Sequence, residues 1–307
     1  MKSLSRNTGK SAALPVTNWN DIPWNRLEKY VRRLQQRIYR ADSLGQRRKV
    51  RSLQRLLMKS KAALLLSIRR VTQINKGKRS AGVDGYTAST PKERVELYNK
   101  MKNLHLSQHK PKATRRTYIP KKNKKLRPLG IPNMIDRVYQ NVVKMALEPQ
   151  WEQRFEMTSH GFRPKRGVHD AVSDIWLKTS GANSRKMWVF EGDFEGCFDN
   201  LNHDYILEQV KDFPQKQLLR RWLKAGYMDN DVFNETPQGT PQGGIVSPLL
   251  ANIALHGMEK ELGIEYMLEK RKRDPNGRWS INDVSKNSPR ISTVRYADDC
   301  APRRCGA

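Results

Sequence analysis

Two adjacent aspartates near the end of the printed sequence restrict the fold more than any other feature. Asp298 and Asp299 follow residues 291–294, ISTV, which are rich in β-branched side chains and predict a strand. The pair falls where that strand would reach a tight hairpin turn. Like charges this close repel, and one of them tends to take up a proton unless a cation neutralises both. The pattern favours a divalent metal site, although an isolated Asp-Asp pair would be read as a polar turn.

A third carboxylate stands at the end of another β-prone stretch much earlier in the chain. Residues 188–193, WVFEGD, end on Asp193. If the two strands are neighbours in one sheet, all three aspartates lie at adjoining strand ends. Such a group could hold two Mg²⁺ ions about 3.5–4 Å apart, the arrangement used for in-line attack on a phosphate.

Five blocks of the sequence resemble those of a known family. Residues 296–299, YADD, resemble the active-site box of reverse transcriptases. Four further blocks resemble the group II intron branch of that family, in the expected order: YIPK and RPLGIP at 118–132, GFRP at 161–164, Asp193 with FD at 198–199, and TPQGGIVSPLL at 240–250. The resemblance runs from residue 19 to residue 299. It implies an α+β fold with the fingers and palm of a right-hand polymerase, preceded by a helical basic N-terminal extension.

The resemblance also predicts how the chain divides. We expect a disordered tail at 1–18, the N-terminal extension at 19–85, fingers at 86–185 and an incomplete palm at 186–299. Residues 300–307, CAPRRCGA, contain a proline and no apolar alternation, so we expect an aberrant tail rather than a strand. Similar reverse transcriptases continue with a thumb. Its absence here predicts a truncated chain with weak activity on its own.

Apolar periodicity predicts several helices and one hairpin. The helices are expected from residue 23 to 38 or beyond, and at 50–68, 91–106, 136–151, 169–177 and 245–262. Alternation around Tyr118 predicts a β-hairpin within 110–127. Residues 269–290 are charged and rich in turn formers, which predicts a loop.

The charge balance implies a polyanionic partner. Lys and Arg number 59 against 30 Asp and Glu, for a formal net charge of +29. No apolar run reaches the roughly 18–20 residues that span a bilayer, so we expect nucleic acid and no membrane. No secretory signal is evident, and three cysteines fit a reducing compartment. We therefore expect a cytoplasmic protein, with an organelle as the alternative.

The N-terminal region carries most of this surplus. Residues 1–80 contain 21 basic and 3 acidic side chains, so we expect phosphate contact with RNA, the alternative being a solvated helical face. The expected RNA-binding residues here and near the hairpin are Arg32, Arg33, Arg47, Arg48, Lys49, Arg69, Arg70, Arg115 and Arg116. Arg163, in the GFRP block, either contacts the template or caps the fold.

Matched positions supply an expected nucleotide pocket. Lys121 and Arg127 resemble the residues that hold the incoming triphosphate, a task suited to a point charge and a forked guanidinium. Phe198 resembles the aromatic plate beneath the sugar, which excludes a ribose 2′-hydroxyl; the alternative is a core phenylalanine. Gln242 resembles the floor of the pocket. The Phe194 backbone carbonyl is expected to add an oxygen ligand to those of the aspartates.

Three hypotheses about function follow. The leading one is an RNA-directed DNA polymerase of group II intron type, with intron RNA, an RNA template, a DNA primer and deoxynucleoside triphosphates as partners and two Mg²⁺ ions as cofactors. The second is an RNA-binding splicing cofactor, a maturase, without polymerase activity. The third is an inert fragment. The intact Asp193, Asp298 and Asp299 set favours the first, and the sequence leaves the oligomeric state open.

Overall fold

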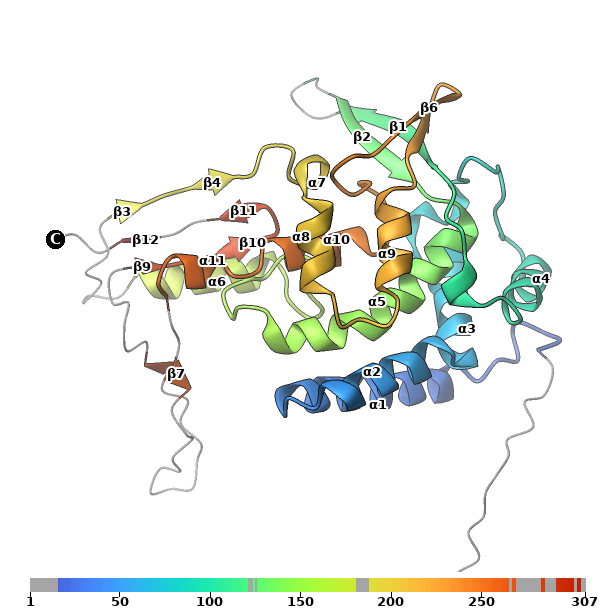
Figure 1. Cartoon of the computed structure of the whole chain (residues 1–307), viewed down its shortest axis with the longest axis horizontal. Helices are drawn as coiled ribbons and strands as arrows, with labels where there is room; N and C mark the ends of the chain where they lie inside the picture. The colour runs from blue at the N-terminus through green and yellow to red at the C-terminus, as the bar shows by residue number, and fades with distance from the viewer. Residues whose placement is uncertain are drawn as a thin grey trace, which may run out of the picture.

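A central helix, α5 (Met134–Arg154), is the element around which the others pack (Figure 1). The structure is a computed structural model that describes residues 16–120, 124, 126–180, 188–264, 267–268, 283–284, 291–300 and 303–304. Most of α5 is buried, including polar residues that bond to neighbouring elements. Asn141 donates to Ser67 Oγ (2.9 Å), and Gln150 accepts from Gln54 (2.8 Å). A buried polar group needs such a partner, so these bonds specify how the helices dock.

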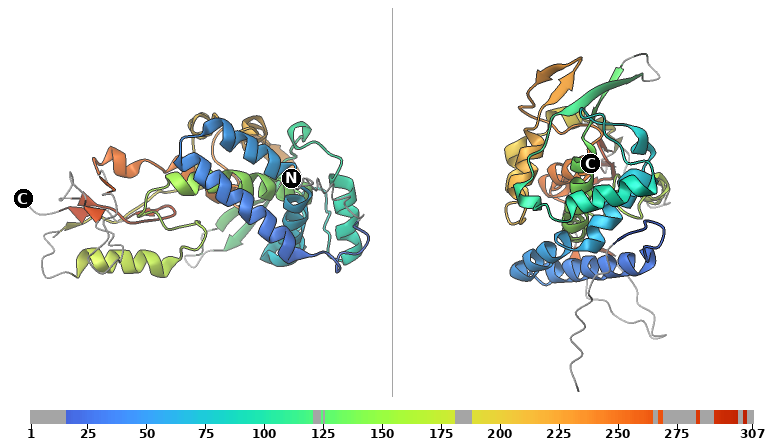
Figure 2. Two further views of the ribbon diagram at one scale, coloured as in Figure 1. Left: turned by 90° about the horizontal axis from the view of Figure 1, so that it is seen from below. Right: turned by 90° about the vertical axis from the view of Figure 1, so that its right-hand side faces the viewer.

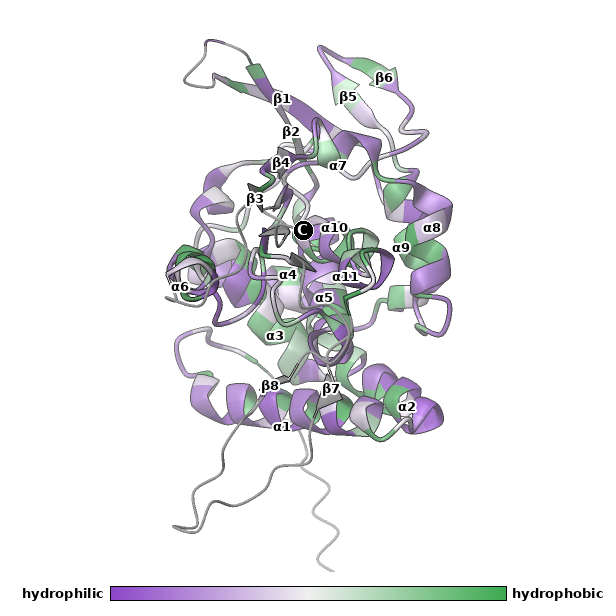
Figure 3. Ribbon diagram, turned by 90° about the vertical axis from the view of Figure 1, so that its left-hand side faces the viewer, coloured by the Kyte–Doolittle hydropathy of each residue, from purple (hydrophilic) through white to green (hydrophobic). Residues whose placement is uncertain are grey.

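Three helices form a layer against α5: α1 (Trp24–Ser43), α2 (Arg47–Met58) and α3 (Lys61–Arg69). Seen from below, α1 and α2 lie side by side across α5 (Figure 2). The predicted stripe of α1 is confirmed, because Val31, Leu34 and Ile38 are buried. Most of the α1 ribbon carries the colour of hydrophilic residues (Figure 3).

The prediction of one helix at residues 50–68 is wrong in one respect. The helix is interrupted after Met58, and a second helix begins at Lys61. Ser60 is extended and its Oγ accepts from the Ala63 N–H (3.1 Å), which makes it the N-cap of a new helix. A π-helical turn, η1 (Arg70–Ile74), and a 3₁₀ turn, η2 (Lys76–Arg79), follow.

Helix α4 (Pro91–Met101) packs against α3. It begins with a capping box between Thr90 and Glu93 and ends before the expected residue 106. A short 3₁₀ turn, η3 (Leu106–Gln108), follows. Farther along the chain, α6 (Val168–Thr179) matches the helix expected at 169–177.

The predicted β-hairpin is confirmed as β1 (Thr114–Pro120) and β2 (Leu126–Ile131). It is one side of a four-stranded sheet with order β2-β1-β5-β6. β5 (Tyr227–Asp229) runs parallel to β1, and β6 (Val232–Asn234) runs antiparallel to β5.

Short helices fill the second half of the chain. They are α7 (Cys197–Asn200), α8 (His203–Gln209), α9 (Lys216–Leu223), α10 (Ser247–Ala254) and α11 (Met258–Glu261). The prediction of a single helix at 245–262 is wrong. The segment forms two separate helices, α10 and α11. Gly257 lies between them with φ +105°, a left-handed conformation that a continuous α-helix excludes.

Two three-stranded sheets and a ribbon complete the fold. β4 (Gly192–Asp193), β10 (Arg295–Tyr296) and β11 (Asp299–Cys300) form one sheet with order β10-β11-β4. β3 (Trp188–Val189), β12 (Arg303–Arg304) and β9 (Ile291–Ser292) form the other, with order β3-β12-β9. β7 (Met267–Leu268) pairs with β8 (Asp283–Val284).

The expectation that no strand follows Asp299 is wrong for three residues. Cys300 pairs with Gly192, and Arg303 and Arg304 lie between β3 and β9. Backbone groups form these ladders, so pairing does not require the apolar alternation that the segment lacks. The loop expected at 269–290 lies outside the described residues except for β8. Across the described part of the chain, no helix is both long and apolar enough to cross a bilayer. The mixture of a helical layer with separate small sheets confirms the α+β prediction.

Candidate active site

The segments that carry the three predicted carboxylates lie together where β4 and β11 pair. The antiparallel register places Asp299 directly opposite Asp193, and residues in that relation have Cβ atoms about 4.5–5.5 Å apart on one face. Asp298 occupies the turn between β10 and β11, and its carbonyl accepts from the Phe194 N–H (3.4 Å). Two segments far apart in the sequence therefore place their aspartates close together in the β10-β11-β4 sheet and its turn.

Negative charge accumulates at this edge. Partial burial raises the pKa of Asp299, and the carboxylates of Asp193, Asp298 and Glu191 raise it further. Burial raises the pKa of the nearby Cys197 thiol to about 11, with the charges of Asp298 and Asp193 contributing, while Arg295 acts in the opposite direction. Both shifts have the sign expected when an acidic group is buried beside negative charges. Cys197 is thus an inert thiol at neutral pH.

The chemistry of the donor set fits a hard divalent cation. Carboxylate and carbonyl oxygens are the ligands that Mg²⁺ prefers, and the Phe194 carbonyl accepts only one bond, from the Cys197 N–H (3.1 Å), among the described contacts. Within the described residues, no three acidic, histidine or cysteine side chains form a ready-made metal cluster. An ion would therefore have to draw the carboxylates together, and it would relieve the repulsion between them.

The turn that carries Asp298 is conformationally unusual. Ala297 has φ +59°, a left-handed conformation that costs a non-glycine residue about 1–3 kcal/mol and persists only where its surroundings fix it. Gly161, the glycine of the GFRP block, lies against this turn. A Cβ atom at Gly161 would come within 2.2 Å of the Ala297 nitrogen. The hairpin can occupy its place only because position 161 has no side chain.

A buried arginine, which our sequence analysis missed, ties the hairpin to the body of the protein. Arg295 is 1% exposed. Its Nη1 donates to the Ala297 carbonyl (3.0 Å) and to Asn252 Oδ1 (3.3 Å), and its Nη2 donates to Ser159 Oγ (2.8 Å). A backbone bridge also joins Arg295 to Ser159. The only signal in the sequence was an arginine placed directly before YADD in a β-prone run.

The nucleotide-side blocks are linked by a series of contacts that starts beside the hairpin. Phe198 is half-buried and packs edge-on against Phe162, with ring centroids 5.9 Å apart. The Phe198 carbonyl accepts from the Thr240 N–H (2.7 Å), and the Gln242 carbonyl accepts from the Gly130 N–H (2.9 Å). Phe198, the PQGG loop and strand β2 are therefore connected by direct contacts.

The two residues predicted to hold the triphosphate are Arg127 and Lys121, and only Arg127 lies among the described residues. Arg127 is exposed and stands opposite Ile119 in the β1–β2 hairpin, which projects from the body of the molecule (Figure 1). Lys121 falls outside the described residues. Neither residue is brought into contact with the carboxylates by a described interaction.

Most of the residues expected to bind RNA are solvent-exposed. The exposed ones are Arg32, Arg33, Arg47, Arg48, Lys49, Arg70 and Arg115. Arg69 pairs with Glu28 (3.1 Å) and lies 4.7 Å from the ring centroid of Trp24, and Arg116 lies 4.0 Å from that of Tyr227. The exposed set remains available to phosphates.

Arg163 is placed differently from the other arginines. Its side chain is buried, donates to Glu152 Oε2 (3.0 Å) and to the Ser159 carbonyl (2.7 Å), and lies over the ring of Phe155. Its guanidinium is engaged by protein acceptors rather than presented to solvent. The geometry therefore supports the structural alternative for Arg163, which braces the segment beneath the hairpin.

Comparison with known families identifies the class of protein. The N-terminal domain of reverse transcriptase matches residues 19–101, and the reverse transcriptase (RNA-dependent DNA polymerase) family matches residues 119–301. The second match covers more than half of the chain and includes all three carboxylates. The chain belongs to the reverse transcriptase family, whose members use divalent metal ions and act on nucleic acid.

Individual relatives agree with this assignment and confirm the resemblance to the group II intron branch. The group II intron-encoded protein LtrA of Lactococcus lactis is 40% identical over 234 residues, which are 72% of this chain and 37% of LtrA. Protein YkfC of Escherichia coli is 38% identical over 267 residues, 80% of this chain and 69% of YkfC. Maturase-like protein 1 of Euglena gracilis is 28% identical over 246 residues, 80% of this chain and 52% of that protein.

Gly161→Ala should misplace the catalytic hairpin. The new methyl group would collide with the backbone of Ala297, and a displacement of about 1 Å can lower a rate about a hundredfold. Primer extension on an RNA template measures the effect. The matched control is Gly167→Ala, where a Cβ atom would meet only Asp170 Oδ2 at 3.8 Å. Wild-type extension by Gly161→Ala would contradict the role of this contact.

Proposed function

We propose that this chain carries the polymerase centre of a group II intron-encoded protein that copies RNA into DNA. The observation that supports this best is the register that sets Asp299 opposite Asp193 with Asp298 in the adjoining turn. We assign deoxynucleoside triphosphates as substrates, intron RNA or another RNA as template, and two Mg²⁺ ions as cofactors. LtrA, which is named as intron-encoded, supports the choice of branch.

Asp193, Asp298, Asp299 and the Phe194 carbonyl would hold the two ions. When bound, Mg²⁺ would lower the pKa of the primer 3′-hydroxyl and neutralise charge on the departing pyrophosphate. The carboxylates position the reacting groups along the edge of the β10-β11-β4 sheet. The buried guanidinium of Arg295 holds the turn that presents Asp298, so the carboxylates keep their relative places.

The remaining site residues would select and orient the nucleotide. We assign Phe198 to the sugar, Gln242 to the base pair, and Arg127 with Lys121 to the triphosphate. The support for the first two is the contact series that runs from Phe162 through Phe198 to the PQGG loop and Gly130. Arg127 belongs to the projecting hairpin and Lys121 lies outside the described residues, so both assignments rest on the motif.

A second candidate function is splicing support without polymerisation. The helical layer α1–α3 presents exposed arginines that are independent of the carboxylates, and one relative is named as maturase-like. The two candidates differ in whether the carboxylates matter. A primer-extension assay beside a splicing assay with an intron RNA separates them, because only the first candidate predicts that the wild type extends a primer, whereas the second predicts that wild type and aspartate variant both splice and that neither extends one.

Asp298→Asn should abolish primer extension and leave RNA affinity intact. The change removes one negative charge from the metal site with almost no change in volume. Loss of several kcal/mol of charge stabilisation corresponds to roughly a thousandfold in rate. Asp231→Asn, at an exposed loop position, is the matched control. A variant that keeps a tenth of the wild-type rate would refute the assignment.

Mg²⁺ should stabilise the folded protein through the same carboxylates. An ion that binds only the folded state raises the free energy of unfolding, so Mg²⁺ at tenfold its Kd should raise Tm by about 2–4 °C. Thermal unfolding with and without Mg²⁺ measures this shift. Asp193→Asn should lose it, whereas Asp231→Asn should keep it. An equal shift in both variants would place the ion elsewhere.

Phe198→Ala should relax the discrimination between sugars. Removing the ring frees the volume that a ribose 2′-hydroxyl would fill, so ribonucleotide incorporation should rise relative to deoxyribonucleotide incorporation even if total extension falls. Single-nucleotide kinetics with both substrates measure the ratio. Phe162→Ala removes the ring that Phe198 packs against and controls for loosened packing. Unchanged discrimination would make Phe198 a packing residue only.

A further inference from the structure

The loop that carries Gln242 contains the same four residues twice. Residues 236–239 read TPQG, and so do residues 240–243, but only the second copy contains a residue assigned to the nucleotide. The end of the first copy lies against α7. Gly239 is buried with φ +84°, and a Cβ atom there would come within 2.5 Å of the Asp199 carbonyl oxygen. Only glycine fits this position, so the first copy docks the loop onto the body of the protein.

Two backbone hydrogen bonds join the loop to the segment of Phe198. The Gly239 N–H donates to the Leu201 carbonyl (2.8 Å), and the Thr240 N–H donates to the Phe198 carbonyl (2.7 Å). The second bond lies only two residues before Gln242. The place of Phe198 relative to Gln242 therefore depends on how this junction is held.

A buried histidine side chain supplies a third bond to the junction. His203 is 5% exposed, and its Nε2 lies 2.5 Å from the Gly239 carbonyl oxygen. Because a carbonyl oxygen can only accept, Nε2 carries the hydrogen and donates it. His203 belongs to none of the five sequence blocks, and no role assigned above uses it.

Helix packing fixes the position of this histidine. His203 is the first residue of α8, and the side chain of Asn202 caps that helix. Helix α8 packs against α10, whose first residue, Ser247, accepts a hydrogen bond from the Thr240 hydroxyl (2.8 Å). Two helices that pack together thus bond to the consecutive residues Gly239 and Thr240.

We propose that His203 is a positioning residue for the incoming nucleotide. It acts through the Gly239 carbonyl, and it keeps Gln242 at the base pair and Phe198 at the sugar. The inference rests on the proposed polymerase function and adds a residue that touches neither substrate nor metal. Loss of the bond should affect nucleotide binding more than the chemical step, because Arg295 holds the turn of Asp298 separately.

His203→Met removes the donor and fills the space with a flexible apolar side chain. Single-nucleotide kinetics on a fixed RNA template and DNA primer test it in the full chain. The KM for the deoxynucleotide should rise about threefold to tenfold, the range that corresponds to one lost hydrogen bond. Ribonucleotide incorporation should rise relative to deoxyribonucleotide incorporation, because the Phe198 carbonyl is bonded to the same loop. RNA affinity should stay at its wild-type value.

His203→Gln is the matched rescue variant. Glutamine has nearly the shape of methionine, and its amide nitrogen stands as many bonds from Cβ as the Nε2 atom of histidine. It can therefore donate to the Gly239 carbonyl. The KM and the sugar ratio should return toward the wild-type values, a result that a role in filling space alone does not predict.

Ile206→Ala separates positioning from stability. Ile206 is fully buried on α8, one turn from His203, so the variant leaves a cavity and lowers Tm. Partial unfolding reduces the amount of active enzyme and hence the apparent kcat, whereas the molecules that remain folded keep their KM. Ile206→Ala should therefore show the wild-type KM even where its Tm falls below that of His203→Met.

Gly239→Ala disturbs the same junction from the side of the loop. Its methyl group would collide with the backbone of Asp199, so KM and the sugar ratio should rise as in His203→Met. Gly45→Ala is the matched control, because Gly45 also has a positive φ (+67°) but a Cβ atom there meets nothing within 4 Å. Both kinetic parameters should be unchanged in that variant.

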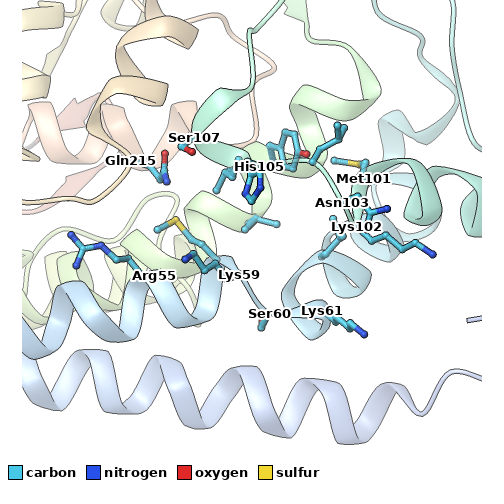
Figure 4. Close-up of a pocket in the computed structure, with 16 residues that line it drawn as sticks. Arg55, Lys59, Ser60, Lys61, Met101, Lys102, Asn103, His105, Ser107 and Gln215 are labelled. Carbon is cyan, nitrogen blue, oxygen red and sulfur yellow. The ribbon is translucent and has the colours of Figure 1, made fainter. Parts of the chain in front are cut away.

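Lys61→Gln is the control for surface charge. Lys61 is exposed at the start of α3, beside a pocket between α2, α3, the end of α4 and α5 (Figure 4). No described contact joins Lys61 to α7, α8 or the TPQG loop. Its KM and sugar ratio should match those of the wild type.

Four outcomes would overturn the inference: wild-type KM and sugar ratio in His203→Met, the same values in Gly239→Ala, no rescue by His203→Gln, or an equal rise of KM in Ile206→Ala. If the wild type extends a primer and one of these outcomes occurs, the proposed function stands and the role of His203 fails. If the wild type extends no primer, the proposed function and this inference both fail.

Discussion

The opposition of Asp193 and Asp299 across a strand pair is the constraint on which the site depends. Two like charges facing each other weaken a sheet, and these strands are only two residues long, so their own ladder cannot hold the arrangement. Contacts with the body of the protein hold the two strands in place. The Arg295 guanidinium donates to the Ala297 carbonyl of the hairpin and to the side chains of Asn252 in α10 and Ser159, and Gly161 leaves room for the turn. A buried charge bonded to several acceptors is costly to misplace, which is why it holds the carboxylates well.

Helix α5 also holds distant segments in place through buried polar contacts. This helix is buried on most of its surface, and Gln140, Asn141 and Gln150 bond to three different neighbouring segments. Gln140 accepts from the Ile245 N–H (2.8 Å) and so supports the loop that carries Gln242. The same helix packs against α1 and α2, which present the exposed arginines, so it connects the proposed nucleotide site with the basic helical layer.

The positive charge of the chain is distributed according to these roles. Exposed arginines on α1 and α2 face solvent, whereas Arg163 and Arg295 are buried and bonded within the protein. Exposed cations release counterions when they meet phosphate, and buried ones hold the fold. Net charge alone therefore identifies a polyanionic partner and says nothing about which arginine contacts it.

The sequence by itself determined the family, the order of the blocks, the helical stripe of α1 and the β1–β2 hairpin, because periodicity and local motifs record local backbone preference. It did not determine the breaks at Ser60 and Gly257, the pairing of Arg303 and Arg304, or the burial of Arg163. Only the tertiary structure decided that Asp299 stands opposite Asp193, that Gly161 is required by Ala297, and that His203 bonds to the Gly239 carbonyl. The reason is physical: strand register, close backbone approach and the pairing of a buried polar atom depend on segments far apart in the chain, and no local pattern encodes the distance between them.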